Sequence, residues 1–247
     1  MSSNIQRGAT PEIRKLAVLG FHKIGAPPPG KSSTWFYIPE RTFESFLREL
    51  QKSSWRVIDA DSFLHGLDFP DSLPEHAALL TFDDGHRSMR HIALPLLRSF
   101  GFASVLFVPV GYVGSTNRFD ADVEPEEPIC DWDDLAAMQQ EDVSIQSHGF
   151  AHRRWSTLGD NELRYELQNS KQLLEERVGR AVRMFSFPYG DNGDDAQTAA
   201  GLLRAAGYSA AFLYGGGPMM MPCPDPFAVQ RIAMGPDTDL AALLNQF

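Results

Sequence analysis

Short apolar segments alternate with longer segments of helical periodicity along this chain, and this alternation limits the folds that it can adopt. Seven segments have the length and composition of β-strands, at residues 15–22, 55–60, 76–82, 102–110, 143–148, 183–189 and 208–214. Several are apolar throughout rather than at alternate positions, which is typical of strands covered on both faces of a parallel sheet. The pattern predicts an α/β protein.

Five of the intervening segments space their apolar residues as on one face of a helix. They cover residues 39–51, 90–101, 131–140, 159–179 and 198–207. Strands that alternate with helices imply right-handed crossovers. About seven such strands in a chain of 247 residues predict one closed or nearly closed β/α barrel, and we expect a single domain over residues 1–247.

Charge and composition count against several classes of protein. The net charge is −10 and the pI is about 5.1, whereas nucleic-acid binders usually carry a basic stripe. Cys130 and Cys223 are too few for a disulfide framework. No segment approaches 18 apolar residues, and the N-terminus lacks the apolar core of a signal peptide. We expect a cytoplasmic protein with no membrane span and no nucleic-acid partner, and the oligomeric state stays open.

Polar residues gather at the carboxyl ends of four predicted strands. They are His22, the pair Asp83–Asp84, His148 with His152, and the turn Pro188–Tyr189–Gly190. Active sites of β/α barrels lie at this end of the strands, so we expect the four groups on one rim. Each group alone has a structural explanation, since Asp83 could cap the next helix. Their coincidence on one rim favours a functional site.

Two histidines and one carboxylate on this rim have the chemistry of a metal site. Such a three-ligand set is common where a catalytic metal keeps one position open for water. A cation bound by one carboxylate of the Asp83–Asp84 pair would also relieve their mutual repulsion. The other carboxylate could then accept a proton from an acidified water. The same set suits an iron(II) oxygenase, but such an enzyme needs no second carboxylate as base.

Three motifs resemble the polysaccharide deacetylase family, the carbohydrate esterases with a NodB-homology domain. They are TFDDG at 81–85, SHGFAH at 147–152 and FSFPYG at 185–190, in this order. GFHKIG at 20–25 and WDDL at 132–135 extend the resemblance over most of the chain. The resemblance implies a distorted (β/α)7-type barrel and metal-dependent hydrolysis of the N-acetyl group of an amino sugar.

The resemblance also implies roles for individual residues. Asp83 is similar to the catalytic base of the family. Asp84, His148 and His152 match the ligands of one divalent metal ion, which we expect to be zinc, with Ni²⁺, Co²⁺ and Fe²⁺ as alternatives. Tyr189 matches the residue whose backbone N–H completes an oxyanion hole with the metal.

Two departures from the family pattern affect the surroundings of these residues. Gly149 stands where Ser or Thr is usual, so a hydroxyl that would brace the metal loop is missing. Ser186 stands where many members have an arginine that orients the base. Arg231 is the candidate that could send a guanidinium back to Asp83.

The usual late histidine of the family is also missing, because no histidine follows His152. His22, in VLGFH, resembles that late motif moved to the front of the chain, and some members have this permuted order. The first and last strands of a barrel are neighbours, which keeps the side chain in place. We therefore predict that His22 is the general acid, with its pKa raised by the nearby carboxylates.

Several further residues are predicted to contact substrate. They are Pro188, Asn117, Asp120, Trp132 and Arg231. The substrate is expected to be an acetylated amino sugar in a polysaccharide or glycan precursor, for instance in O-antigen biosynthesis. A catalytically impaired sugar-binding homologue and an amidohydrolase of non-sugar amides remain as alternatives.

Overall fold

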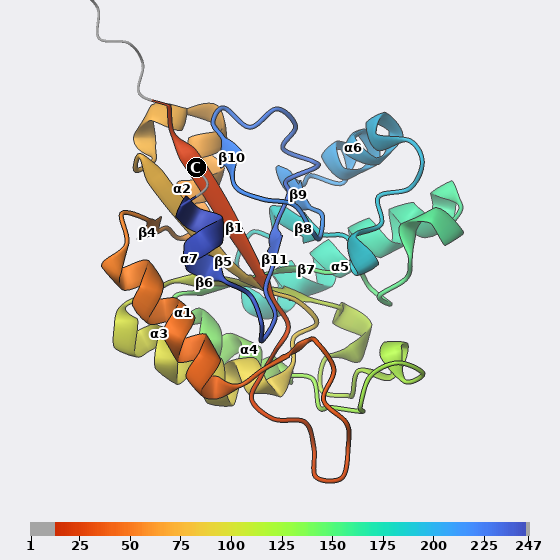
Figure 1. Cartoon of the computed structure of the whole chain (residues 1–247). Helices are drawn as coiled ribbons and strands as arrows, with labels where there is room; N and C mark the ends of the chain where they lie inside the picture. The colour runs from red at the N-terminus through yellow and green to blue at the C-terminus, as the bar shows by residue number, and fades with distance from the viewer. Residues whose placement is uncertain (1–12, 246–247) are drawn as a thin grey trace, which may run out of the picture.

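A nine-stranded sheet forms the centre of the described part of the protein, residues 13–245 of this computed structural model (Figure 1). Its main path joins β10 (Met219–Met220), β1 (Lys15–Phe21), β5 (His76–Phe82), β6 (Ser104–Val108), β7 (Val143–Ser147), β8 (Met184–Ser186) and β9 (Ala210–Phe212). All neighbours from β1 to β9 are parallel, and β10 is antiparallel to β1. The predicted parallel α/β architecture is confirmed. Residues 1–12 and 246–247 of the expected domain lie outside the described residues.

The segment 226–233 closes this sheet into a distorted barrel. Its last residues form β11 (Ile232–Ala233), which pairs in parallel with β1. Its first residues bond to β9, where Val229 N donates to Ala211 O at 2.9 Å and Leu213 N donates to Val229 O at 2.9 Å. One segment therefore bridges the first and last strands, and the (β/α)7-type barrel is confirmed.

The number of barrel strands, seven, was predicted correctly, but the segment 55–60 is not one of them. Of residues 55–60 only β4 (Arg56–Val57) is a strand, and it pairs with the start of β5 alone. The seventh barrel strand is β11, whose two residues are too few to give a periodic signal. A small second sheet pairs β2 (Lys23–Ile24) with β3 (Tyr37–Ile38) just after β1.

Seven α-helices surround the barrel in the part of the chain from residue 13 to 245. They are α1 (Glu40–Lys52), α2 (Ala60–Asp68), α3 (Leu94–Phe100), α4 (Trp132–Gln139), α5 (Asp160–Val178), α6 (Ala196–Ala205) and α7 (Leu240–Asn245). The sequence predicted all but α2 and α7, and it started α3 too early because residues 89–93 form a π-helical turn. None of these helices is long and apolar enough to cross a membrane.

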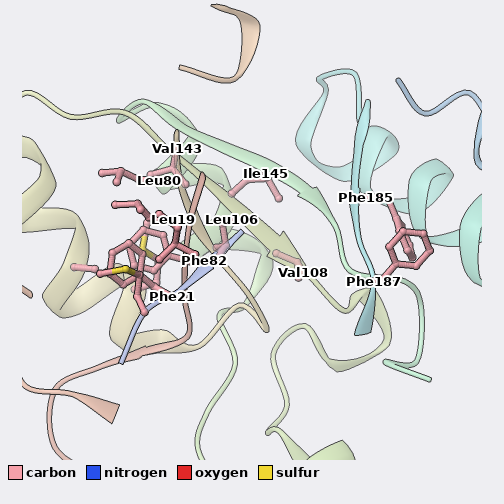
Figure 2. Packing of buried hydrophobic residues seen from close by; sticks show 14 of the residues in the cluster. Leu19, Phe21, Leu80, Phe82, Leu106, Val108, Val143, Ile145, Phe185 and Phe187 are labelled. Atoms are coloured by element: carbon pink, nitrogen blue, oxygen red, sulfur yellow. The ribbon is translucent and has the colours of Figure 1, made fainter. Parts of the chain in front are cut away.

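The barrel strands are buried on both faces, which explains why their sequences do not alternate. Leu19, Leu80, Phe82 and Leu106 belong to a large core that includes the helices (Figure 2). The opposite faces of the strands form a second core, which Phe63 of α2 joins by packing on Phe212 at 5.4 Å between ring centroids.

Strand β5 extends from the second core to the polar residues at its carboxyl end. Its residues on that face are Ala77 and Leu79, both fully buried, followed by Thr81 and then Asp83. Alternation along the strand therefore places the ionisable side chain of Asp83 on the same face as the apolar residues of the second core. The candidate site starts at the carboxyl end of β5.

We expect Phe63→Ala to lower the free energy of unfolding by about 3–5 kcal/mol, because it leaves a cavity in the second core. Phe69→Ala is the matched control, since Phe69 follows the same helix and is 59% exposed. Urea unfolding of the two variants and the wild type measures the difference. Equal losses would contradict the assignment of α2 to the core.

Candidate active site

A cavity of about 360 Å³ opens at the carboxyl ends of the barrel strands. It is lined by many of the residues that the sequence singled out: His22, Asp83, Asp84, Asp120, His148, His152 and Tyr189. A larger hollow of about 640 Å³ lies among the opposite strand ends, and none of these residues lines it. The four polar groups predicted to share one rim therefore meet in one cavity.

Three of the cavity residues have a left-handed backbone, which is uncommon for residues other than glycine. The φ angles are 70° for Asp84, 52° for His152 and 61° for Tyr189. Among described non-glycine residues only Asp142 shares this conformation. Such conformations cost of order 1–3 kcal/mol each and cluster at functional sites, where the surrounding structure enforces them.

Asp84, His148 and His152 form a group that could hold a metal ion. One ligand atom from each lies within 4.8 Å of the others, and all three side chains are buried. Oδ1 of Asp84 lies 3.4 Å from Nε2 of His148 and 3.2 Å from Nε2 of His152. This set of an oxygen and two imidazole nitrogens is the donor chemistry of a catalytic zinc site.

The polar atoms inside this group support the fit of a cation. Oδ1 of Asp84 is buried and accepts no hydrogen bond from any residue between 13 and 245. Nδ1 of His148 lies 2.7 Å from the carbonyl oxygen of Ser186, so it carries the proton and Nε2 is left bare. A cation between Oδ1 of Asp84 and Nε2 of His148 would satisfy the lone pairs of both atoms.

Asp84 remains ionised in this environment. Burial raises the pKa of its carboxyl, but the facing imidazoles of His148, His152 and His86 lower it more, to well below the usual value. An ionised carboxylate is the form that binds a cation. Asp84 is therefore charged at neutral pH, ready to contribute one oxygen.

Asp83 is held by a bidentate pair with Arg231. Nη1 of Arg231 donates to Oδ1 at 2.8 Å and Nη2 donates to Oδ2 at 2.7 Å. Burial raises the pKa of Asp83, but Arg231 and His148 together lower it by more than burial raises it, so the net shift is downward. Asp83 is thus a buried, ionised carboxylate that shares the cavity with the metal-binding group.

Arg231 lies behind Asp83 and is fully buried, so it does not line the cavity and contacts the carboxylate rather than a substrate. Nε also donates to the carbonyl oxygen of Leu213, and Nη2 to Oγ of Ser186 at 2.9 Å. Oγ of Ser186 thus accepts a hydrogen bond from the Arg231 guanidinium. Residue 186 carries no arginine here, and Arg231 supplies the guanidinium that orients Asp83.

Glu166 of α5 braces the loop that carries the two histidines. Its Oε2 accepts hydrogen bonds from the backbone N–H of Phe150 at 2.6 Å and of Ala151 at 2.9 Å. Gly149 has φ of 79°, and a Cβ there would lie only 3.0 Å from the same carboxylate oxygen. A buried glutamate therefore supplies the support that the missing hydroxyl would have given.

His22 lines the cavity, but its electrostatics differ from the sequence expectation. Its ring packs between Phe36 and Tyr214, at 4.6 and 5.1 Å between centroids. Burial lowers the pKa of His22 to about 4, although Asp84 and Asp83 act in the opposite direction. The predicted rise in its pKa is wrong, because removal from water outweighs the two carboxylates, and the resting imidazole is neutral.

Tyr189 forms the outer wall of the cavity with three neighbours. Its hydroxyl donates to Oδ1 of Asp120 at 3.1 Å, and its ring lies 4.7 Å from that of His152. The guanidinium of Arg154 lies over the Tyr189 ring, 4.4 Å from its centroid. Phe119 also packs against His152, with 4.1 Å between the ring centroids. The wall is aromatic with charged groups at its edge.

Three of the predicted substrate contacts are not in the cavity. Asn117 is buried and bonds to the carbonyl oxygen of Pro125 and the N–H of Glu127, so it holds its loop together. Trp132 begins α4 and packs against the helix core. Pro188 is the buried first residue of the turn that presents Tyr189. None of the three lines the cavity, so their positions do not support the predicted contact with substrate.

The sequence interpretation missed a buried ion pair in the cavity wall. Nζ of Lys23 lies 2.7 Å from Oε2 of Glu124, which also accepts from the hydroxyl of Thr34 at 2.8 Å. The pair ties the chain after β1 to the loop that carries Asp120. Lys23 directly follows His22, and this adjacency was the only signal available in the sequence.

The contact of His86 with Asp84 was also missed. Nε2 of His86 lies 3.4 Å from Oδ2 of Asp84, and both side chains are buried. Only the spacing of two residues from Asp84 could have indicated this contact.

Sequence comparisons agree with this geometry. The family model described as polysaccharide deacetylase matches residues 71–211, more than half of the chain. The YxkH protein of Bacillus subtilis (strain 168) is 22% identical over 191 residues, 77% of this chain and 62% of that protein. The poly-β-1,6-N-acetyl-D-glucosamine N-deacetylase of Staphylococcus aureus (strain MRSA252) is 19% identical over 163 residues, 65% of this chain and 56% of that protein. The matches span less than two thirds of either relative.

Solved structures share the fold. The Streptococcus pyogenes deacetylase PplD in complex with acetate has a TM-score of 0.80 at 16% identity, over 94% of this chain and 98% of its own. IcaB from Ammonifex degensii has a TM-score of 0.77 at 23% identity, over 94% of this chain and 97% of its own. With the barrel, the cavity and a family match over more than half its length, the chain belongs to the polysaccharide deacetylase family.

Proposed function

We propose that this protein is a zinc-dependent deacetylase that removes the acetyl group from an N-acetylated amino sugar of a glycan. The proposal rests on the presence of two groups of residues in one cavity. The group Asp84–His148–His152 can hold a cation, and the ionised Asp83 shares the cavity with it. Neither half alone would support hydrolysis, because one supplies a Lewis acid and the other a base.

When bound, a divalent cation would acidify a water molecule and polarise the acetyl carbonyl. Asp83 would take the proton from the attacking water, and Arg231 keeps this carboxylate ionised and fixed in orientation. The backbone N–H of Tyr189 would donate to the developing oxyanion. Preorganised donors of this kind typically contribute about 2.7–4 kcal/mol. The left-handed backbone at Tyr189 is consistent with a turn held for that purpose.

The leaving amine needs a proton, and we assign its delivery to His22. Because the resting imidazole is neutral, His22 cannot start the cycle as an acid. It would receive a proton during turnover, and the one that Asp83 removes from water is available in the same cavity. His22 would pass it to the nitrogen as the C–N bond breaks, which leaves acetate and the free amine.

The cavity wall suits a sugar ring more than a purely apolar amide. Phe36, Tyr189 and Tyr214 offer aromatic faces, and Asp120 and Glu124 offer carboxylate acceptors for hydroxyl groups. The staphylococcal relative is named for poly-β-1,6-N-acetyl-D-glucosamine, which makes that polymer the first substrate to test. An O-antigen precursor is the second. The intact Asp83–Arg231 pair disfavours an impaired sugar-binding homologue.

We expect the zinc-loaded protein to release acetate from N-acetylated glucosamine oligomers, and Asp83→Asn to lose this activity by about 10²–10⁴-fold. An amide in place of the carboxylate cannot accept the proton of water. Acetate release is measured enzymatically, and bound zinc by elemental analysis. Zinc content should stay at the wild-type level in the variant. Loss of zinc would mean that Asp83, not Asp84, is the ligand.

We expect Arg231→Met to shift the acid limb of the kcat/KM profile to higher pH. Arg231 lowers the pKa of Asp83, and without it burial raises that pKa, so the base stays protonated at pH values where the wild type is ionised. In the wild type, the lowered pKa adds stability above the ordinary aspartate pKa, and this is lost as the pH falls through the folded pKa. At neutral pH the variant should lose about 3–5 kcal/mol of folding free energy.

The profile is measured with N-acetylated glucosamine oligomers, and stability by urea unfolding. Arg48→Met is the control, because Arg48 is an exposed residue of α1. An unchanged acid limb in a folded Arg231→Met protein would remove Asp83 as the base.

We expect His22→Ala to reduce amide hydrolysis more than hydrolysis of an activated acetate ester, whose leaving group needs little protonation. Zinc binding should be unaffected, because His22 is not part of the ligand group. Rates on N-acetylglucosamine oligomers and 4-nitrophenyl acetate are compared for the variant and the wild type. Equal losses on both substrates would exclude His22 as the proton donor.

A further inference from the structure

His86 is a buried histidine that none of the steps above uses, and it lies against the carboxylate of Asp84. Its Nε2 is 3.4 Å from Oδ2, and the two side chains are only 3% and 5% exposed. His148 and His152 face the other oxygen, Oδ1. The two oxygens of Asp84 therefore have separate neighbours, with a histidine pair on one side and a single histidine on the other.

The backbone holds His86 in this place. Asp84 and Gly85 both have left-handed φ angles, 70° and 72°, so the chain leaves the extended path of β5 before residue 86. The segment 128–130 then runs antiparallel beside His86. It bonds on both sides of it, accepting from Arg87 N at 3.0 Å and donating to Gly85 O at 2.9 Å. These bonds fix the backbone on both sides of His86, and its side chain is buried.

His86 and His148 both present Nε2 to Asp84, but the proton lies on different nitrogens of the two rings. An ionised carboxylate only accepts hydrogen bonds, so the His86 nitrogen that faces it carries the proton. The other nitrogen of His86, Nδ1, is buried and has no partner among residues 13–245. In His148 the proton is on Nδ1, which bonds to Ser186 O, and the bare Nε2 faces the carboxylate. His148 is thus arranged as a ligand, and His86 as a donor.

We propose that His86 is a positioning residue of the metal site, whose Nε2–H holds Oδ2 of Asp84 and leaves Oδ1 as the single oxygen presented to the cation. The cation itself would be held by Asp84, His148 and His152. Hydrogen-bond partners of metal ligands fix ligand orientation, and their mutation typically costs ~10–100-fold in metal affinity or activity. The inference rests on the metal site of the proposed function.

The test is the affinity of the full chain for zinc alone, which needs no substrate. The protein is stripped with a chelator and titrated with Zn²⁺ in competition with a chromophoric chelator. We expect His86→Phe, which keeps the ring and removes the donor, to weaken binding ~10–100-fold. His86→Gln, whose amide N–H can reach the same oxygen, should recover most of the affinity. His91→Phe is the matched control at an exposed position and should bind as the wild type does.

Circular dichroism checks the fold of each variant, and His86→Ala replaces His86→Phe if the larger side chain prevents folding. X-ray absorption of the zinc-loaded wild type and His86→Gln should show the same number of nitrogen ligands. Wild-type affinity in a folded variant without the donor would overturn the proposal. Loss of one nitrogen ligand in His86→Gln would also overturn it, since His86 would then bind zinc directly. Absence of zinc binding by the wild type would instead refute the proposed metal site itself.

Discussion

The buried pair between Arg231 and Asp83 connects the closure of the barrel to the chemistry of the cavity. Arg231 belongs to the segment 226–233 that bridges β9 and β1, so its guanidinium is positioned only when the barrel is closed. A buried carboxylate without its partner would be costly to keep ionised. The fold and the ionisation state of the candidate base therefore depend on one contact between residues 148 positions apart.

The rest of the site is held by hydrogen bonds from neighbouring segments of the fold. Glu166 fixes the backbone after His148, and the segment 128–130 fixes the backbone around His86. The left-handed backbones of Asp84 and His152 directly adjoin these supports, which bond to Gly85 and Ala151. A site of this kind has its ligand atoms arranged before any cation arrives, which reduces the reorganisation that binding requires.

The sequence was sufficient for the features that depend on local chemistry. Uniformly apolar strands predicted a sheet buried on both faces, and polar residues at strand ends predicted that His22, Asp83, Asp84, His148 and His152 would meet. It failed where a feature has no local signal. The two residues of β11 carry no periodicity, and α2 follows a segment that resembles a strand. Trp132 matched a motif but packs on the helix core, because a motif does not fix where a side chain points.

The sequence by itself determined the architecture and the identity of the residues in the cavity, because hydrophobic periodicity and strand-end position act over a few residues. Only the tertiary structure decided the charge states and partners of those residues. Whether His22 is protonated depends on how far Phe36 and Tyr214 exclude water from it, and burial there outweighs the attraction of two carboxylates. Whether Asp83 stays ionised depends on an arginine from the far end of the chain. Desolvation and Coulomb attraction depend on distance in space, and sequence spacing does not contain that distance.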